Sequence, residues 1–224
     1  MNKIKSYQIK VSGLVQGVGF RPFVYRIASK HALVGCVENR NDGVIIIVEG
    51  NEKQIDAFSH DLLIAAPTAS SIISIEKNEI SNIGFTRFEI IRSNNAGNEI
   101  TEISPDIAVC EECLLDLDLQ PHRFNYPFIN CTNCGPRFTI INNLPYDRNK
   151  TTMNIFPMCS LCQEEYSDVL NRRFHAQPVA CNHCGPRYKL TLLNKNNNES
   201  ISDFNEILKK TAQIINSGDI VSIK

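Results

Sequence analysis

The sequence predicts an α+β protein made of two unlike halves and a short C-terminal segment. Strand-like and helix-like apolar patterns alternate over residues 1–92, as in a compact α+β domain. Eight of the nine cysteines lie between Cys110 and Cys184. They form two groups of four with nearly identical spacing, which indicates a duplicated unit. The fold class therefore changes between the two halves.

The composition is that of an ordinary globular protein. The 224 residues are 42% hydrophobic and 21% charged, with a net charge of -1, and this length predicts one or two domains. Nine cysteines are too few for a disulfide scaffold. The N-terminus lacks a signal-peptide pattern, and the strongest apolar run, Val44 to Val48, is far shorter than a membrane span. We therefore expect a cytoplasmic protein with no membrane partner, whose paired cysteines bind metal or serve redox chemistry.

The first half begins with a strand and a helix. Apolar residues alternate over 7–11, which is typical of a strand with one buried face. Apolar residues recur at helical spacing over 23–28, directly after Pro22, a residue favoured in the first turn of a helix. These elements predict a first βα unit.

A hairpin and a second βα-type pair follow. Residues 33–37 and 44–48 are apolar strands, and the turn between them, Glu38 to Gly43, ends in an Asp-Gly pair. Cys36 in the first of these strands is expected to be a small buried apolar residue rather than a nucleophile. A helix is predicted over 52–65. Two further strands are predicted over 72–80 and 85–91.

The resulting order is βαββαβ with a possible extra edge strand. The order βαββαβ is the ferredoxin-like arrangement, in which two helices cover one face of an antiparallel sheet. We expect residues 1–92 to form this domain. A polar segment over 93–104 is expected to be a linker, and residues 105–190 the duplicated cysteine region.

The duplicated region repeats more than its cysteines. The first quartet is Cys110, Cys113, Cys131 and Cys134, and the second is Cys159, Cys162, Cys181 and Cys184. The displacement between them is 49 or 50 residues. Arg123-Phe124 returns as Arg173-Phe174, and a Cys-Gly-Pro-Arg sequence ends each quartet. The whole unit is therefore duplicated.

Each quartet is predicted to bind one structural Zn²⁺. Two Cys-x-x-Cys pairs supply the four thiolates of a closed tetrahedral zinc site. The spacers between pairs, residues 114–130 and 163–180, suit paired zinc knuckles. A thioredoxin-like redox motif is normally single, and iron-sulfur ligation needs a different spacing, so both alternatives are disfavoured.

The spacing leaves the pairing of the cysteines open. Adjacent pairing joins the two pairs of one quartet, whereas nested pairing joins the first and last pairs of the region. His122, His175 and His183 are also available, but four sulfurs complete each repeat, so we expect these imidazoles to be solvated or hydrogen-bonded. Basic and acidic residues alternate here, so nucleic-acid binding is not indicated.

The pattern of the C-terminal segment predicts the start of another domain. A helix is predicted over 204–215 and a strand over 220–223, after a polar break at 194–200. A helix and a strand with nothing to pack on predict a third domain, beginning within 200–224 and truncated. The alternative is a terminal helix docked on the zinc region.

The loop over residues 12–22, between the first strand and helix, is a candidate anion site. Its glycines permit conformations closed to other residues and a close approach of the backbone. The donors expected to surround a phosphoryl group are the backbone N–H groups of Gln16, Gly17, Val18, Gly19, Phe20 and Arg21. The Arg21 guanidinium would add charge-assisted bidentate hydrogen bonds. The alternative is a merely tight βα turn.

The stretch Gly13-Leu14-Val15-Gln16-Gly17-Val18-Gly19-Phe20-Arg21, with Asn39 and Asp42-Gly43 downstream, resembles the acylphosphatase family. The resemblance covers residues 5–91. It implies a ferredoxin-like enzyme that hydrolyses carboxylic-phosphoric anhydrides. Arg21 would bind the phosphate and Asn39 would orient the attacking water, although Asn39 also reads as an ordinary turn former at a strand end.

Followed by two Cys₄ repeats, this domain is similar to the N-terminal part of the HypF carbamoyltransferase family of [NiFe]-hydrogenase maturation. The resemblance implies that carbamoyl phosphate is hydrolysed here, and that absent YrdC-like and transferase domains use ATP to carbamoylate a cysteine of the partner HypE. The full transfer is not expected from this chain alone. The alternative function is a zinc-ribbon protein-binding module with a non-catalytic anion-binding domain.

Overall fold

The computed structural model describes residues 4–93, 102–193 and 198–223. The chain divides into two compact units, Met1–Gly185 and Pro186–Lys224. Most of the predicted 93–104 linker lies outside the described residues. No helix among the described residues is long and apolar enough to cross a membrane.

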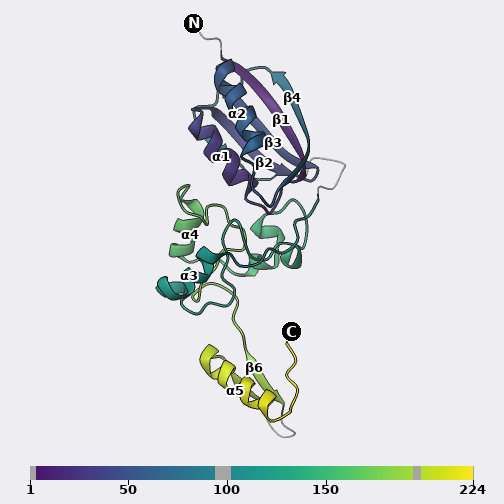
Figure 1. Cartoon of the computed structure of the whole chain (residues 1–224). Helices are drawn as coiled ribbons and strands as arrows, with labels where there is room; N and C mark the ends of the chain where they lie inside the picture. The colour runs from purple at the N-terminus through teal and green to yellow at the C-terminus, as the bar shows by residue number, and fades with distance from the viewer. Residues whose placement is uncertain (1–3, 94–101, 194–197, 224) are drawn as a thin grey trace. The chain divides into compact units, whose positions relative to one another are not determined.

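The first part of the large unit is a five-stranded sheet with two helices on one face (Figure 1). Its elements are β1 (Lys5–Leu14), α1 (Phe20–Lys30), β2 (Val34–Arg40), β3 (Gly43–Gly50), α2 (Glu52–Ile64), β4 (Ser71–Ile80) and β5 (Phe88–Ile90). The strand order is β4-β1-β3-β2-β5, with β5 parallel to β2 and the other pairs antiparallel. The predicted ferredoxin-like α+β domain is confirmed, although β5 is shorter than the strand predicted over 85–91.

The apolar faces of α1 and α2 make the core with the sheet. Phe20, Val24 and Ala28 are almost fully buried on α1, and so are Ile55 and Phe58 on α2. This is the spacing that the sequence showed. Helix α1 begins two residues before Pro22, which is tolerated because the first N–H groups of a helix have no intrahelical acceptor.

The hairpin differs from its prediction. Strand β2 continues to Arg40, so the turn consists of Asn41 and Asp42 only, and Asn39 is not a turn residue but a strand residue opposite Val44. Two-residue connections are the commonest hairpin turns. Gly43 has φ 141°, and a Cβ there would lie 2.3 Å from the carbonyl oxygen of Val11, so the adjacent strand requires glycine.

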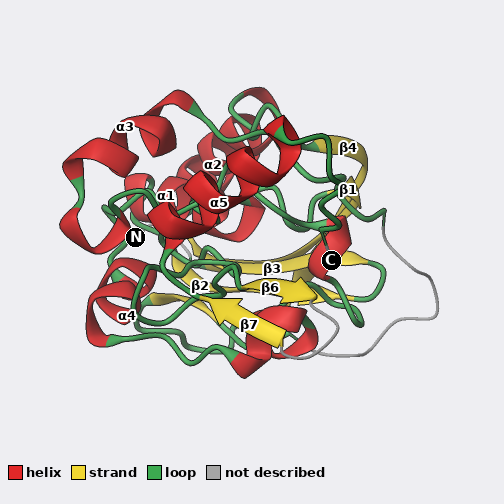
Figure 2. Cartoon of the chain, turned by 90° about the horizontal axis from the view of Figure 1, so that it is seen from below, coloured by secondary structure: helices red, strands yellow, loops and turns green. Residues whose placement is uncertain are grey.

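The duplicated cysteine region is mostly loop (Figure 2). Its helices are α3 (Glu111–Leu119) and α4 (Ser160–Ser167), each beginning directly after the first cysteine of a quartet. Four 3₁₀ turns lie at Pro121–Arg123, Phe138–Ile140, Arg148–Lys150 and Thr152–Ile155. With so little regular structure, this region depends on side-chain contacts for its stability.

The two repeats bind each other through exchanged, equivalent contacts. The backbone N–H of Thr132 donates to Arg172 O at 3.2 Å, and that of Asn182 donates to His122 O at 3.0 Å. The two donors lie 50 positions apart in the chain, and so do the two acceptors. The second hydrogen bond is therefore equivalent to the first, with donor and acceptor taken from the opposite repeats. The repeats therefore form one pseudo-symmetric body.

The small unit contains β6 (Leu190–Leu193), β7 (Asn198–Ile201) and α5 (Phe204–Asn216). The predicted helix over 204–215 is confirmed, and Asp203 caps it by accepting from the backbone N–H of Glu206 at 2.8 Å. The β6–β7 hairpin was not predicted, because asparagines interrupt its apolar pattern. The strand predicted over 220–223 is wrong: these residues join no sheet, and Ile220 is 94% exposed, so nothing supplies the ladder that a strand needs.

Candidate active site and metal centres

The glycine loop presents its backbone as a row of donors. Gly17 and Gly19 have φ values of 72° and 75°, in the left-handed region, and Gly19 is the N-cap of α1. Among the described residues, the backbone N–H groups from Gln16 to Arg21 have no protein acceptor. The side chains of Val18 and Phe20 lie in the core, so the polar groups that these residues can offer the site are those of their backbone.

Arg21 lies buried beside this loop, with 8% of its side chain exposed. Its Nη1 donates to Asp147 Oδ1 at 2.7 Å and to Ser93 Oγ at 3.3 Å. Its Nη2 donates to the carbonyl oxygen of Tyr146 at 3.2 Å. The predicted phosphate-binding arginine is therefore oriented by residues about 125 positions away in the chain.

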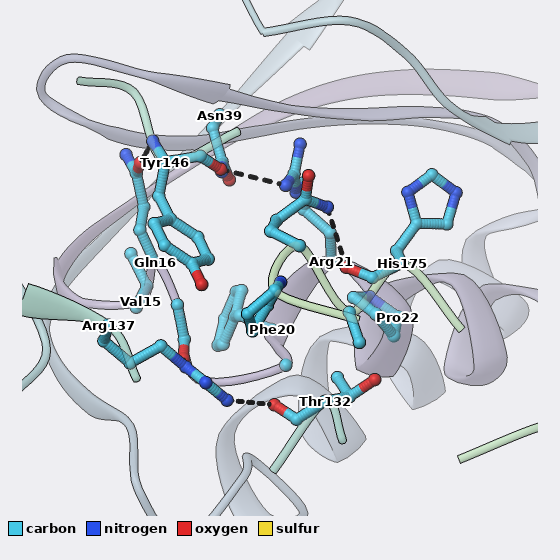
Figure 3. A pocket seen from close by; sticks show the side chains of 15 residues that line it. Val15, Gln16, Phe20, Arg21, Pro22, Asn39, Thr132, Arg137, Tyr146 and His175 are labelled. Carbon is cyan, nitrogen blue, oxygen red and sulfur yellow. Dashed lines mark hydrogen bonds between the residues drawn. The ribbon is translucent and has the colours of Figure 1, made fainter. Parts of the chain in front are cut away.

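The backbone of Tyr146 connects the three polar side chains of the site (Figure 3). Its carbonyl oxygen accepts from Arg21 and from Asn39 Nδ2, the latter at 3.3 Å. Its N–H donates to Gln16 Oε1 at 3.0 Å. Asn39 is 1% exposed and its Oδ1 has no hydrogen-bond partner, which leaves a buried acceptor beside Arg21. Arg21 and Asn39, predicted from separate motifs, are thus brought together.

A cavity lies in front of the loop. Its walls include the glycine loop, Arg21 and Asn39 on one side and Thr132, Tyr146 and His175 on the other. About 20 Å³ of it is open to the centres of water molecules. A sphere of this volume has a radius of about 1.7 Å, and adding the radius of a water molecule, about 1.4 Å, gives a space of roughly 3 Å radius, about the size of a phosphate group. The cavity suits a small tetrahedral anion.

Several residues of this site were not predicted. Arg137 donates through Nε to Gly17 O and through Nη2 to Thr132 O at 2.8 Å, which ties the loop to the cysteine region. The repeated Cys-Gly-Pro-Arg motif marked Arg137 as special without showing its target. Tyr146 and Asp147 lie in an irregular spacer, where no periodicity or motif indicated a contact with the first domain.

Burial sets the protonation of the aromatic groups at the cavity. It raises the pKa of Tyr146 to about 12, so this hydroxyl stays protonated at neutral pH. Burial, and then the charge of Arg21, lower the pKa of His175 to about 4. His175 is therefore neutral at pH 7.

The lowered pKa of His175 predicts an acid-sensitive stability. Between about pH 6.5 and 4 the unfolded chain binds more protons at this imidazole than the folded chain, so stability falls as the pH is lowered. The expected loss from pH 7.5 to 5.5 is about 1 to 2 kcal/mol. His175→Asn should remove it, because Asn125 holds the equivalent position of the first repeat with nearly the same φ, 53° against 54°. Urea unfolding of the parent and of His175→Asn at the two pH values measures the free energy of unfolding of each. If the two proteins lose the same free energy between pH 7.5 and 5.5, the prediction is wrong.

The cysteines form two separate Cys₄ clusters, one in each repeat, and all sulfurs of a cluster lie within 4.8 Å of one another. Adjacent pairing is therefore the one that the structure adopts. Neighbouring sulfurs are 3.6 to 3.8 Å apart in the first cluster and 3.7 to 3.8 Å apart in the second. Four sulfurs at about 2.3 Å from one Zn²⁺ would be about 3.8 Å apart, so both clusters fit the ion.

Buried arginines surround the clusters in the same exchanged pattern as the backbone. Arg123 of the first repeat donates to Cys162 Sγ of the second at 3.4 Å and pairs with Glu165 at 2.5 Å. Arg173 of the second repeat reaches Cys113 Sγ of the first at 3.9 Å and pairs with Asp116 at 2.6 Å. The charge of each Cys₄ site is thus offset by an arginine of the other repeat.

Cys36 agrees with its prediction, and the histidines do so in part. Cys36 is 5% exposed, and burial raises the pKa of its thiol to about 11, which is typical of an inert core cysteine. Neither cluster includes a histidine. His122 instead lies 2.7 Å from Arg123 Nη1.

Family models match both parts of the large unit. The acylphosphatase model matches residues 7–90, and the model described as the HypF finger matches residues 109–141 and 158–191. The acylphosphatase of Oceanobacillus iheyensis is 33% identical over 89 residues, which are 39% of this chain and 98% of that protein. The chain therefore carries an enzyme domain of the acylphosphatase family.

Longer relatives match both parts together. The carbamoyltransferase HypF of Rhodobacter capsulatus is 44% identical over 185 residues, 82% of this chain and 24% of that protein. A crystal structure of full-length HypF in a phosphate- and nucleotide-bound form is 44% identical, with a TM-score of 0.87 over 97% of this chain and 28% of that one. The chain thus spans about a quarter of the length of these relatives. By its acylphosphatase domain, its paired fingers and these relatives, the chain belongs to the HypF family.

Proposed function

We propose that this chain hydrolyses carbamoyl phosphate, as the first step of a HypF-type carbamoyltransferase reaction. The observation that carries the proposal is the cavity that Arg21, Asn39 and the glycine loop line, together with the lack of acceptors for the loop's N–H groups among the described residues. Anions bind well where several backbone N–H groups and a guanidinium meet at a helix N-terminus. The phosphate of an acyl phosphate suits this site.

The reaction needs positioning and charge stabilisation more than covalent catalysis. Asn39 donates through Nδ2 to Tyr146 O, so its Oδ1 is left to accept a hydrogen bond from the attacking water. Attack of that water on phosphorus forms a P–O bond and breaks the bond to the carbamoyl oxygen. The products are carbamate and phosphate, and the proton of the water passes to phosphate or solvent. The loop and Arg21 stabilise the charge on the phosphoryl oxygens.

The two clusters are proposed to hold structural Zn²⁺, because four cysteines close each coordination sphere and leave no position for a substrate. In the cytoplasm, where thiols stay reduced, such sites are stable. Carbamoylation of HypE would use ATP and YrdC-like and transferase parts outside these 224 residues. The segment 200–224 is proposed to begin the YrdC-like part, with the boundaries 1–92, 93–104 and 105–190 before it.

Hydrolysis of carbamoyl phosphate and acetyl phosphate by the 224-residue chain tests the proposal. Asn39→Ala is expected to lower kcat about 100-fold with little change in KM, because only the positioning of the water is lost. Asn78→Ala, at an exposed position of β4, is the matched control and should leave the rate unchanged. A chain inert toward both substrates, or Asn39→Ala as fast as its parent, would contradict the proposal and favour a binding module.

A further inference from the structure

The ion pair between Arg21 and Asp147 lies at the centre of the site. It joins the acylphosphatase domain to the duplicated cysteine region, residues 105–190, which is called the finger region below. The two groups are 2.7 Å apart, with 8% and 21% of their side chains exposed. The Coulomb attraction between two charges so shielded from water is stronger than between two charges on the surface. Because the ion pair lies beside the phosphate-sized cavity, we expect it to affect phosphate binding as well as to connect the two domains.

The contacts of the finger region hold Arg21 without using all of its donors. Asp147 accepts from Nη1 and the carbonyl of Tyr146 accepts from Nη2. Among the described residues, Nε has no acceptor. A guanidinium has five N–H groups in a rigid plane, so one edge can bind an anion while another is held by a carboxylate. Asp147 and a phosphate can therefore bind Arg21 at the same time.

Holding the guanidinium in advance favours phosphate binding. A free arginine side chain loses conformational freedom when it is fixed. In this chain that loss occurs on folding, through Asp147, Tyr146 O and Ser93. Of these contacts, only the longest, from Ser93 at 3.3 Å, comes from outside the finger region.

Asp147 is in turn fixed by its neighbour Arg148. The guanidinium of Arg148 donates to the carbonyl oxygens of Gln177, Val179 and Phe156 at 2.8, 2.7 and 2.6 Å. Val179 lies two residues before Cys181, a member of the second cluster. The position of Asp147 is thus set by the backbone of the second repeat.

We propose that Asp147 is the positioning residue of Arg21, supplied by the finger region to complete the phosphate site of the acylphosphatase domain. The inference rests on the proposed function only in taking phosphate as the ligand of Arg21. The acyl group and the later transfer do not enter into it.

Equilibrium binding of inorganic phosphate to the whole 224-residue chain, measured by calorimetry, tests this role without turnover. Asp147→Ala is expected to raise the Kd for phosphate about 10- to 100-fold, the effect of losing a charge-assisted hydrogen bond. Asp147→Asn keeps an acceptor and should fall in between. Asp118→Ala, at an exposed position of α3, is the matched control and should bind as the parent does.

A double-mutant cycle separates positioning from a general loss of structure. In an Arg21→Ala background, Asp147→Ala should add no further loss, because the residue that it positions is gone. An equal loss in both backgrounds would overturn the proposal. So would tighter phosphate binding by Asp147→Ala, which would make Asp147 a competitor of phosphate, or a parent that binds no phosphate. A parent that binds phosphate in the expected way but does not hydrolyse carbamoyl phosphate refutes the proposed function alone.

Discussion

Replacement of Arg21 by alanine is expected to lower kcat/KM for acyl phosphate hydrolysis by about three orders of magnitude or more. Arginines that stabilise a transferring phosphoryl group contribute about 10³ to 10⁵ in rate. Arg21 is suited to this role because it is buried, oriented by Asp147 and Tyr146, and faces a loop of unpaired backbone N–H groups. The measurement is steady-state phosphate release from carbamoyl phosphate and acetyl phosphate.

Two further variants show whether the loss comes from the arginine's hydrogen-bonding geometry. Arg21→Lys keeps the charge but loses the planar fork, so it should recover only a small part of the rate. Arg26→Ala lies on the exposed side of the same helix and should hydrolyse as the parent does. If Arg21→Ala retains the parent rate and only its unfolding midpoint falls, Arg21 is a structural ion-pair partner and the hydrolytic assignment is wrong.

The sequence predicted those parts of the site that are encoded locally. The glycine loop and Arg21 lie within nine residues, and each Cys-x-x-Cys pair is a single turn, so residue type and spacing were enough. Strand and helix periodicity likewise predicted the βαββαβ order. Each of these features depends on neighbours in the chain, which a sequence pattern records directly.

The contacts between distant segments could not be predicted in this way. Asp147 meets Arg21 across 126 positions, and nothing in Pro-Tyr-Asp-Arg indicates which surface it will face. Asn39 was placed in a turn because the strand continues through polar residues up to Arg40, where apolar alternation has ended. The pairing of the cysteines follows from the positions of the sulfurs in the folded chain, which spacing alone does not encode.

Removal of one cysteine ligand from either Cys₄ cluster is expected to lower the metal content of both clusters. Cys162→Ser deletes a ligand of the second cluster and also the sulfur to which Arg123 of the first repeat donates. A structural Zn²⁺ contributes an apparent binding free energy of about 10 to 16 kcal/mol, which exceeds the total stability of about 5 to 15 kcal/mol of a typical domain. The region has only short helices to retain its shape without the ion.

The metal content of purified Cys162→Ser, measured by atomic emission, should therefore fall below one ion per chain rather than to one. Cys36→Ala is the matched control, because it removes a buried cysteine outside both clusters and should retain both ions. A Cys162→Ser protein that keeps one ion would contradict the coupling and show that the repeats fold independently.

The arginine pairs allow the coupling to be tested with every ligand in place. Arg173→Met removes the contacts with Asp116 and Cys113 Sγ but leaves all eight cysteines. Loss of a group that supports a metal ligand typically weakens the site about 10- to 100-fold, so a chromogenic chelator should extract metal from this variant correspondingly faster. The first cluster should be affected first, because Arg173 belongs to the second repeat but contacts a sulfur of the first. Faster release from the second cluster alone would mean that each arginine supports its own repeat, and the exchanged contacts would then not be the source of the coupling.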